Sequence, residues 1–263
     1  MLVSRPAALE ALAAQPARSA LVLDFDGVLA PIVEDPETSA MPSRTIESLG
    51  RLAGALGLVA VISGRPAAFL ADRIQVAEVR LLGSYGMEQI NGRNGHVHPA
   101  AAQWLAAVNG ARKILAELLA GLPGVRIEAK PVSVAVHWRQ APDRDAAAAE
   151  VSRATARVAE QTGLRLEPGK LVSELRPPVD VDKGTAVAEL IAEAAPLVIA
   201  YAGDDLGDLP ALQVARESHG YALVVDHGAE TDPRLTAVAD EVFQGTDSFA
   251  AWLAGLATAV GTD

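Results

Sequence analysis

Three short apolar runs along the chain each end in a polar segment. They span residues 20–23, 58–62 and 197–202. Because their apolar residues are contiguous rather than alternating, the runs are typical of strands buried on both faces of a parallel sheet. Further strands are expected at residues 79–83 and 221–225. The pattern therefore predicts an α/β fold with a doubly wound, Rossmann-like parallel-sheet core, in which ligands bind beyond the carboxyl ends of the strands.

The residues that follow the first two runs are separated by enough chain for one βαβ crossover. Asp24 follows the first run and Ser63 follows the second. A helix is expected between them at residues 43–55, with Ser43 as its N-cap, because a serine hydroxyl can accept a hydrogen bond from the first turn. This spacing predicts that Asp24 and Ser63 lie at one edge of the sheet.

The segment between Ser63 and Lys183 is much longer than a parallel connection requires, which is about a dozen residues. Strand-like stretches in it, separated by turn signals at 121–124 and 168–169, are residues 125–130, 132–139, 164–167 and 171–176. Apolar residues alternate with more polar ones along 132–139, as in a sheet with one buried face. Helices at 100–119 and 145–162 are expected to cover that face. We predict a small α/β cap, residues 101–178, inserted into a core of residues 1–100 and 179–263.

The composition limits the partners and the compartment. The 263 residues are 50% hydrophobic, and the net charge of −11 argues against a nucleic-acid partner. The chain has no cysteine, so disulfides and thiol chemistry are excluded. Glu10, Pro16 and Arg18 interrupt the alanine-rich start, so no secretion signal is expected, and no apolar run reaches the roughly 18 residues of a membrane span. We expect a cytoplasmic monomer that acts on a small molecule and binds neither nucleic acid nor a membrane.

Two carboxylates follow the first strand. Asp24 and Asp26 lie two positions apart, so an extended chain places both on one side. Adjacent carboxylates repel unless one is protonated or a cation lies between them, and Mg²⁺ is the natural cation for oxygen ligands. A carboxylate can also attack phosphorus and form an aspartyl-phosphate. The alternative is an ordinary turn formed by Asp26 and Gly27.

The second polar segment, Ser63-Gly64-Arg65, offers groups that bind phosphate. It presents a hydroxyl, backbone N–H groups and a guanidinium. The alternative is a turn that leads into a helix beginning at Pro66.

Lys183 occupies an unusual position. It follows Asp182, a suitable N-cap residue, so it lies in the first turn of a helix, where the helix dipole disfavours a cation. Gly184 comes next, although glycine is unfavourable inside helices. Two local conflicts side by side often mark a functional site, whereas the alternative is an exposed lysine.

The last polar segment, residues 203–208, holds Asp204, Asp205 and Asp208. If it meets the two earlier aspartates at one sheet edge, five acids lie together and repel strongly without a cation. A metal site is therefore predicted, with a solvated acidic loop as the alternative. The five histidines form no pair with metal-ligand spacing on a helix, so zinc is not expected.

In this order, the polar segments resemble the motifs of the haloacid dehalogenase-like phosphatases. The matching residues are Asp24-Phe25-Asp26-Gly27, Ser63, Lys183-Gly184 and Gly203-Asp204-Asp205 with Asp208. A cap between the second and third motifs resembles the sugar-phosphatase branch. Further segments resemble the trehalose-6-phosphate phosphatase family: residues 26–32, 63–65, 83–88, 128–130, 136–139 and 174–177. The resemblance extends over about residues 21–211.

The resemblance implies a Mg²⁺-dependent phosphatase that converts trehalose 6-phosphate to trehalose and phosphate through an aspartyl-phosphate intermediate. By the same resemblance, Asp24 is the nucleophile. Asp26 protonates the departing sugar oxygen and then activates water. Ser63 and Lys183 hold the phosphoryl oxygens.

The resemblance also implies the ligands of the Mg²⁺ ion. Asp24 binds it through the side chain and Asp26 through the backbone carbonyl. Asp204 completes the protein ligands, with Asp205 or Asp208 in support.

The polar face of the cap binds the sugar in the resembling family. The matching positions are Glu128, Lys130, Arg139, Lys170 and Glu174. Outside the cap, Arg65 is also expected to bind the substrate. Glu128 and Lys130 share one face of a strand, and so can Lys170 and Glu174. From the residues alone, a solvated face of a small sheet is the alternative.

Three positions depart from the family pattern, and these departures bear on which sugar phosphate is the substrate more than on the type of reaction. Val28 replaces a threonine, Tyr85 replaces a histidine, and residues 207–209 replace Thr-Asp-Glu. The alternative functions are a phosphatase for sucrose phosphate or a glycosyl-glycerate phosphate, and a non-catalytic sugar-phosphate sensor. A phosphomutase of this fold would carry its cap between the first two motifs, where this chain has too few residues.

Overall fold

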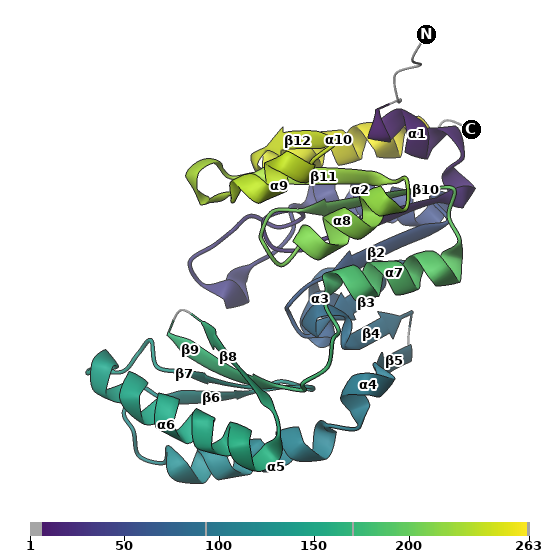
Figure 1. Cartoon of the computed structure of the whole chain (residues 1–263). Helices are drawn as coiled ribbons and strands as arrows, with labels where there is room; N and C mark the ends of the chain where they lie inside the picture. Colours follow the sequence, from purple (N-terminus) through teal and green to yellow (C-terminus); the bar gives the residue numbers. More distant parts are fainter. Residues whose placement is uncertain (1–6, 93, 170, 262–263) are drawn as a thin grey trace. The chain divides into compact units, whose positions relative to one another are not determined.

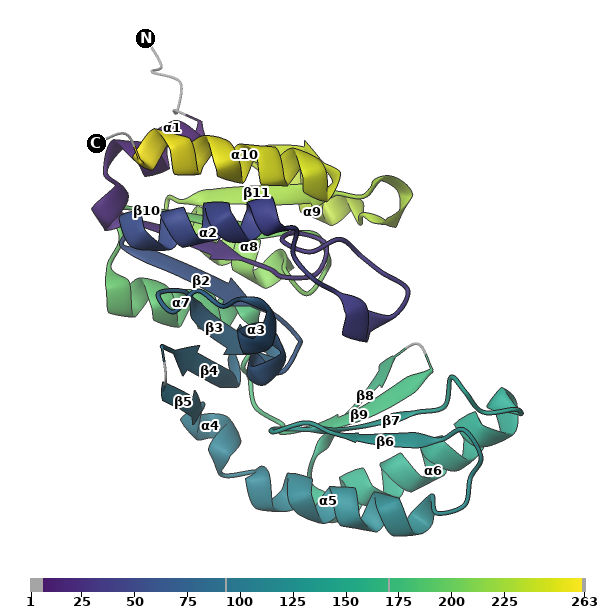
Figure 2. The same ribbon diagram turned by 180° about the vertical axis from the view of Figure 1, so that it is seen from behind.

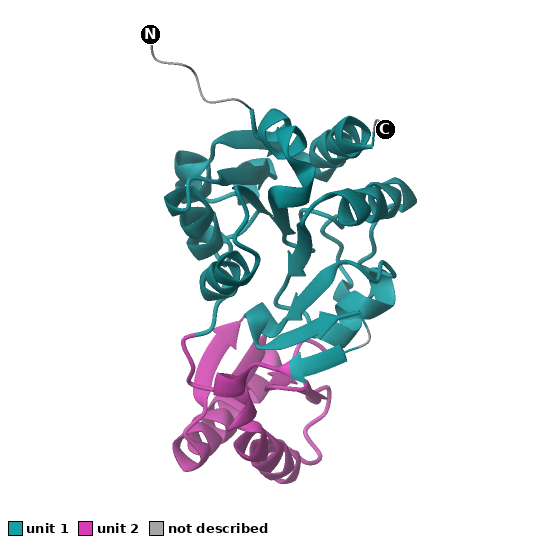
Figure 3. Cartoon of the chain, turned by 90° about the vertical axis from the view of Figure 1, so that its right-hand side faces the viewer, with its two compact units in different colours: residues 1–96, 181–263 teal, residues 97–180 magenta. Residues whose placement is uncertain are grey.

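The computed structural model describes residues 7–92, 94–169 and 171–261. The chain forms two compact units: unit 1 comprises residues 1–96 and 181–263, and unit 2 comprises residues 97–180 (Figure 3). Unit 2 is thus a single continuous insertion into unit 1.

Unit 1 contains an eight-stranded sheet with the order β12-β11-β10-β1-β2-β3-β4-β5. The strands are β1 (Ser19–Leu23), β2 (Leu58–Ile62), β3 (Arg80–Gly83), β4 (Glu88–Asn91), β5 (Asn94–Val97), β10 (Val198–Gly203), β11 (Tyr221–Asp226) and β12 (Glu241–Gln244). The strands from β12 to β3 are parallel, whereas β4 pairs antiparallel with β3. The three apolar runs described above form β1, β2 and β10, which are adjacent strands in the centre of the sheet.

Helices cover both faces of this sheet (Figures 1 and 2). Leu21 and Leu23 face the layer of α1 (Ala8–Ala14), α2 (Ser43–Ala55), α3 (Ala67–Arg73) and α10 (Gly245–Val260). Ala20 and Val22 face the layer of α7 (Lys183–Ala194), α8 (Leu209–Glu217) and α9 (Pro233–Val238). Because adjacent residues of β1 are buried on opposite faces, the strand reads as one unbroken apolar run. The predicted doubly wound α/β core is confirmed.

Two expected helix starts differ from the structure by one residue. Ser43 is the first residue of α2, not its N-cap. Pro42 precedes it with an extended backbone (φ −60°, ψ 144°), the conformation that an N-cap residue requires. Likewise, α3 begins at Ala67 with Pro66 as its N-cap. By contrast, Asp182 caps α7 as expected and forms a capping box with Thr185.

The edge strands β5 and β12, and β4 next to β5, were not expected from the sequence. They are short and largely polar or exposed, so they lack the apolar pattern that marks the central strands. Short 3-10 helices lie at Pro16–Arg18, Pro36–Thr38, Ser84–Gly86 and Gly228–Glu230.

Unit 2 packs helices on one face of an antiparallel sheet with the order β6-β7-β9-β8. Its elements are α4 (Pro99–Ala102), α5 (Leu105–Leu118), β6 (Arg126–Ala129), β7 (Val134–His137), α6 (Arg144–Thr162), β8 (Arg165–Gly169) and β9 (Val172–Arg176). Val134, Val136 and Leu175 form one core with residues of α5 and α6. The alternation expected along this strand is therefore present in β7.

The turn expected at 168–169 is wrong. Strand β8 continues to Gly169, which pairs with Val172, so the reversal comes later. Pro168 is tolerated within β8 because this is an edge strand, where a missing N–H leaves no neighbour unpaired.

Within the described ranges, no helix combines the length and apolarity that crossing a bilayer requires.

Candidate active site

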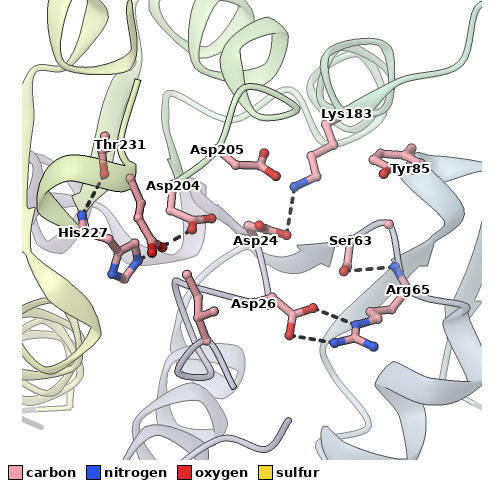
Figure 4. A pocket seen from close by; sticks show the side chains of 13 residues that line it. Asp24, Asp26, Ser63, Arg65, Tyr85, Lys183, Asp204, Asp205, His227 and Thr231 are labelled. Carbon is pink, nitrogen blue, oxygen red and sulfur yellow. Dashed lines mark hydrogen bonds and ion pairs between the residues drawn. The ribbon is translucent and has the colours of Figure 1, made fainter. Parts of the chain in front are cut away.

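The carboxyl ends of β1, β2 and β10 open into a pocket of about 440 Å³ in unit 1 (Figure 4). Its lining includes Asp24, Asp26, Ser63, Arg65, Lys183, Asp204 and Asp205, all named from the sequence as candidate site residues. Apart from Lys183, which begins α7, these residues come from loops far apart in the chain, and the parallel strand order brings those loops together.

Asp24 and Lys183 form a buried ion pair in this pocket. Lys183 Nζ lies 2.9 Å from Asp24 Oδ1, and the two residues are 3% and 4% exposed, respectively. The backbone N–H of Asp24 donates to the Ala202 carbonyl on β10, which fixes the end of β1. The alternative of an exposed lysine is therefore wrong.

Asp208 holds Lys183 from the other side. Its Oδ1 accepts hydrogen bonds from Lys183 Nζ at 2.7 Å and from the Tyr201 hydroxyl at 2.5 Å. Its Oδ2 accepts from the backbone N–H groups of Asp204 and Asp205 at 3.0 and 3.1 Å. Because four donors occupy this fully buried carboxylate, its geometry suits fixing the loop and Lys183 rather than facing the pocket.

The carboxylates of this edge are electrostatically unbalanced. One carboxylate oxygen from each of Asp24, Asp204 and Asp208 lies within 4.8 Å of the other two. Burial and the charge of Asp208 raise the pKa of Asp24 well above its usual range, and the same causes raise the pKa of Asp204 to about 7. Burial lowers the pKa of Lys183, but the charges of Asp208 and Asp24 outweigh it and the net direction is upward.

A divalent cation fits this donor set. The pocket offers oxygen ligands, and its carboxylates carry more negative charge than Lys183 alone offsets. Since the Asp208 oxygens are already engaged, Asp24 and Asp204 are the side chains suited to bind such an ion. Asp205 also lines the pocket, and burial is the main cause that raises its pKa.

Gly27 allows the loop after β1 to approach Asp204. It has φ +79°, and a Cβ atom at this position would lie 2.0 Å from Asp204 Oδ2. Its carbonyl accepts from His227 Nε2 at 2.9 Å and from the Thr246 hydroxyl at 3.2 Å. The Asp-Gly turn weighed as an alternative is thus present, and it is part of the site.

Ser63, Arg65 and Asp26 lie together on the other side of the pocket (Figure 4). The Ser63 hydroxyl accepts from the backbone N–H of Arg65 at 3.2 Å. Arg65 donates to both carboxylate oxygens of Asp26, from Nε to Oδ2 at 2.8 Å and from an Nη to Oδ1 at 3.1 Å. Asp26 Oδ1 also accepts from the Ser39 hydroxyl at 2.7 Å. The segment therefore positions side chains as well as forming the turn into α3.

A left-handed turn carries Tyr85 into the pocket. Ser84, Tyr85 and Gly86 have φ values of 50°, 62° and 102°. The Tyr85 ring passes so close to Gly64 that a Cβ there would lie 2.8 Å from it. Consecutive left-handed residues are strained, and such strain is concentrated at functional sites.

Sequence reasoning missed several residues that line the pocket. None was named as a site residue: His227, Glu230 and Thr231 were not singled out at all, whereas Ile32 and Tyr85 were noted only within segments that resemble the family, Tyr85 also as a departure from its pattern. His227 follows β11 as an isolated histidine, and no motif or spacing marks it. Only the packing of the loop after β11 beside Gly27 reveals its position.

Unit 2 brings three of the predicted sugar-binding residues onto one sheet face. Glu128 and Glu174 both lie in register with Ala135. Lys130 Nζ contacts Glu174 Oε2 at 3.0 Å, and His137 Nε2 contacts Glu128 Oε2 at 2.7 Å.

The hydrogen bond to His137 lowers the pKa of Glu128. Arg139 is exposed beyond the end of β7. Lys170 lies outside the described residues. The face that carries Glu128, Lys130 and Glu174 is opposite the one that α5 and α6 cover.

Comparison with known sequences points to one family. The sequence model of the family described as Trehalose-phosphatase matches residues 22–239. The trehalose-phosphate phosphatase of Mycobacterium tuberculosis is 37% identical over 246 residues, covering 88% of this chain and 61% of the relative. That of Mycobacterium marinum is 36% identical over 228 residues, covering 84% of this chain and 57% of the relative. The chain thus spans only about 60% of the length of these curated relatives.

A solved structure shows the same fold. A crystal structure described as a trehalose-6-phosphate phosphatase related protein superposes with a TM-score of 0.74 at 21% identity. The superposition covers 91% of this chain and 97% of that one. At this identity the likeness concerns the fold alone.

Proposed function

This chain belongs to the trehalose-phosphatase family, and on that premise we propose that it hydrolyses trehalose 6-phosphate to trehalose and inorganic phosphate. The observation that carries the proposal is the buried contact of Lys183 with both Asp24 and Asp208 beside the pocket. Transfer of a phosphoryl group depends on placing a nucleophile and a fixed positive charge together, and this contact provides both.

In the first step, a carboxylate oxygen of Asp24 attacks phosphorus and the bond between phosphorus and the sugar oxygen breaks. Asp26 gives its proton to that oxygen, so trehalose leaves as an alcohol. The product on the enzyme is an aspartyl-phosphate. Ser63 and Lys183 donate hydrogen bonds to the phosphoryl oxygens as charge redistributes.

In the second step, Asp26 takes a proton from water, and the resulting hydroxide oxygen attacks phosphorus. The bond from phosphorus to the Asp24 oxygen breaks, which releases inorganic phosphate and restores both carboxyl groups. Asp26 therefore regains in the second step the proton that it gives in the first.

A Mg²⁺ ion would be held by the Asp24 and Asp204 side chains and the Asp26 backbone carbonyl, and it would supply positive charge beside the phosphoryl group. Burial and the charge of Asp208 raise the pKa values of Asp24 and Asp204, and a cation beside these carboxylates would offset both effects, which supports this assignment.

We assign sugar recognition to the polar face of the unit 2 sheet, which makes this unit a specificity cap. Glu128, Lys130 and Glu174 support the assignment because charged groups on one face can hydrogen-bond several sugar hydroxyls. Arg139 and Lys170 are part of the same proposal. A cytoplasmic monomer that acts on a small molecule remains our expectation.

The test is phosphate release in the presence of Mg²⁺ from trehalose 6-phosphate, sucrose 6-phosphate and glucose 6-phosphate. We expect kcat/KM to be highest for trehalose 6-phosphate. Preference for sucrose 6-phosphate would assign a different sugar, and no release from any ester would favour a sugar-phosphate sensor.

A further inference from the structure

We propose that Ser39 and Arg65 are positioning residues that hold the Asp26 carboxyl group in the orientation from which it serves the leaving group. This inference rests on the proposed function, because it takes Asp26 as the group that exchanges a proton with the sugar oxygen. It also gives Arg65 a role through Asp26 in place of the direct substrate binding expected from the sequence.

Ser39 and Arg65 together satisfy the Asp26 carboxylate. Arg65 reaches it with two parallel hydrogen bonds of 2.8 and 3.1 Å, one to each oxygen, and the Ser39 hydroxyl adds a third of 2.7 Å to Oδ1. A two-pronged guanidinium contact fixes the plane of a carboxylate, which a single hydrogen bond cannot do. The donors come from separate parts of the chain, so the carboxylate is held from two directions.

A stack of side chains on α3 keeps Arg65 in place. The Arg65 guanidinium lies 4.5 Å from the centre of the Phe69 ring, and the Arg73 guanidinium lies 3.5 Å from the same centre. Phe69 in turn meets the edge of Phe25, the residue between the two site aspartates, with ring centres 5.9 Å apart. Arg65 therefore loses little freedom when it binds Asp26, because aromatic packing already orients it.

Arg73 also fixes the segment that carries Ser39. It donates to the Ser39 carbonyl at 2.8 Å and to the Glu37 carbonyl at 2.6 Å. A single helix face thus positions both donors to Asp26: Arg65 directly, and Ser39 through its backbone.

The two residues differ in their access to a substrate. Arg65 lines the pocket, whereas Ser39 is 0% exposed and does not occur among the residues found to line it. Any effect of Ser39 on turnover must therefore pass through Asp26. This difference separates positioning from direct substrate binding.

The experiment compares kcat/KM for phenyl phosphate and 4-nitrophenyl phosphate, which are similar in size but differ in how much the leaving oxygen needs a proton. Ser39→Ala and Arg65→Lys are measured beside wild type. Arg80→Gln is the matched control, because Arg80 makes a two-pronged contact with Glu193 outside the pocket. Thermal unfolding establishes that each variant is folded.

We expect both site variants to lose about tenfold or more on phenyl phosphate and less than about threefold on 4-nitrophenyl phosphate, since general acid catalysis is worth about 10²–10⁴-fold in total. Arg80→Gln should behave as wild type on both esters. The first step alone determines kcat/KM here, so the later attack of water does not mask the difference.

Equal losses on the two esters would overturn the proposal, because they would indicate a structural role. Unchanged rates on both would overturn it as well, because loss of the contacts with Asp26 would then not affect departure of the leaving group. If Ser39→Ala does not fold, Arg65→Lys decides alone. A wild-type protein that hydrolyses no phosphate ester would instead refute the proposed function and this inference with it.

Discussion

Lys183 shows how one buried residue organises the site. A cation in the first turn of a helix is unfavourable, and burial adds to the cost. Contacts with Asp24 and Asp208 offset both effects. Gly184 makes the arrangement possible, because a Cβ there would lie 2.7 Å from Pro210 Cβ and would separate α7 from the start of α8. The cation in the first turn of α7 and the glycine that follows it thus have the same explanation: both are needed to place Lys183 between Asp24 and Asp208.

Asp24→Asn tests the assignment of the nucleophile. The amide keeps the shape of the side chain but removes the attacking charge, so kcat should fall by roughly three orders of magnitude or more. Folding should persist because Lys183 retains its contact with Asp208. Phosphate release and thermal unfolding measure the two effects. Asp247→Asn is the control, since Asp247 is exposed and pairs with Arg44 at the surface, outside the pocket. Near-normal turnover in Asp24→Asn would refute the mechanism.

The sequence identified those site residues that directly follow central strands. Asp24, Ser63 and Asp204 follow apolar runs, and parallel pairing brings the ends of such runs together. The pairing of Arg65 with Asp26 could not be predicted, because it depends on how side chains from two different loops are directed. His227 was missed for the same reason, since its contact with Gly27 joins distant loops.

At the level of elements, the central buried strands and α2, α6 and α7 were predicted from the sequence, whereas the sheet edges, one turn and α8, α9 and α10 were not. The single helix expected at 100–119 is two helices, α4 and α5. Continuous apolar residues mark the central strands in the sequence. Strand β5 lacks this pattern, because it is exposed and contains Asn94, Gly95 and His96. The strand β8 passes through Pro168, a residue that usually ends strands. In both cases position at the sheet edge, which a local pattern does not reveal, decided the structure.

The sheet face of unit 2 supplies a test of substrate selectivity. In Lys130→Ala, the contact with Glu174 is lost together with a charged hydrogen-bond donor, each such bond being worth about 1.5–3 kcal/mol. We expect kcat/KM for trehalose 6-phosphate to fall by at least about tenfold, and that for 4-nitrophenyl phosphate to change much less, because the aryl ester has no sugar to recognise.

Lys113→Ala on α5 is the control for this prediction, because it removes an exposed lysine from the same unit without touching the sheet. Equal losses on the two esters would assign Lys130 to the stability of unit 2. Unchanged selectivity would mean that other residues recognise the sugar.

At the scale of the whole molecule, the net charge of −11 and the acidic pocket present a difficulty for a phosphate dianion. Lys183 alone does not balance the carboxylates around it. The family resemblance inferred from the motifs is confirmed by the sequence comparisons. That unit 1 carries out catalysis and unit 2 determines substrate specificity stays a prediction.

Removal of divalent cations should therefore abolish phosphate release, and Mg²⁺ should restore it. The physical reason is that carboxylates at a few ångströms repel one another and the substrate phosphate alike. The same ion should raise the unfolding temperature of wild type, because a ligand that binds only the folded state stabilises it. Asp204→Asn should reduce that shift. Full turnover in EDTA would contradict the metal assignment.

The pairing of β1 with β10 has a consequence for how the protein folds as it is synthesised. Ser19 is in register with Val198, so the central strand lacks one neighbour until most of the chain has left the ribosome. Unit 2 lies wholly between these two strands and emerges earlier. Once folded, it shortens the flexible loop that must close and lowers the entropic cost of the pairing. We expect the insert to fold first and the edge that carries Asp24 and Asp204 to assemble last.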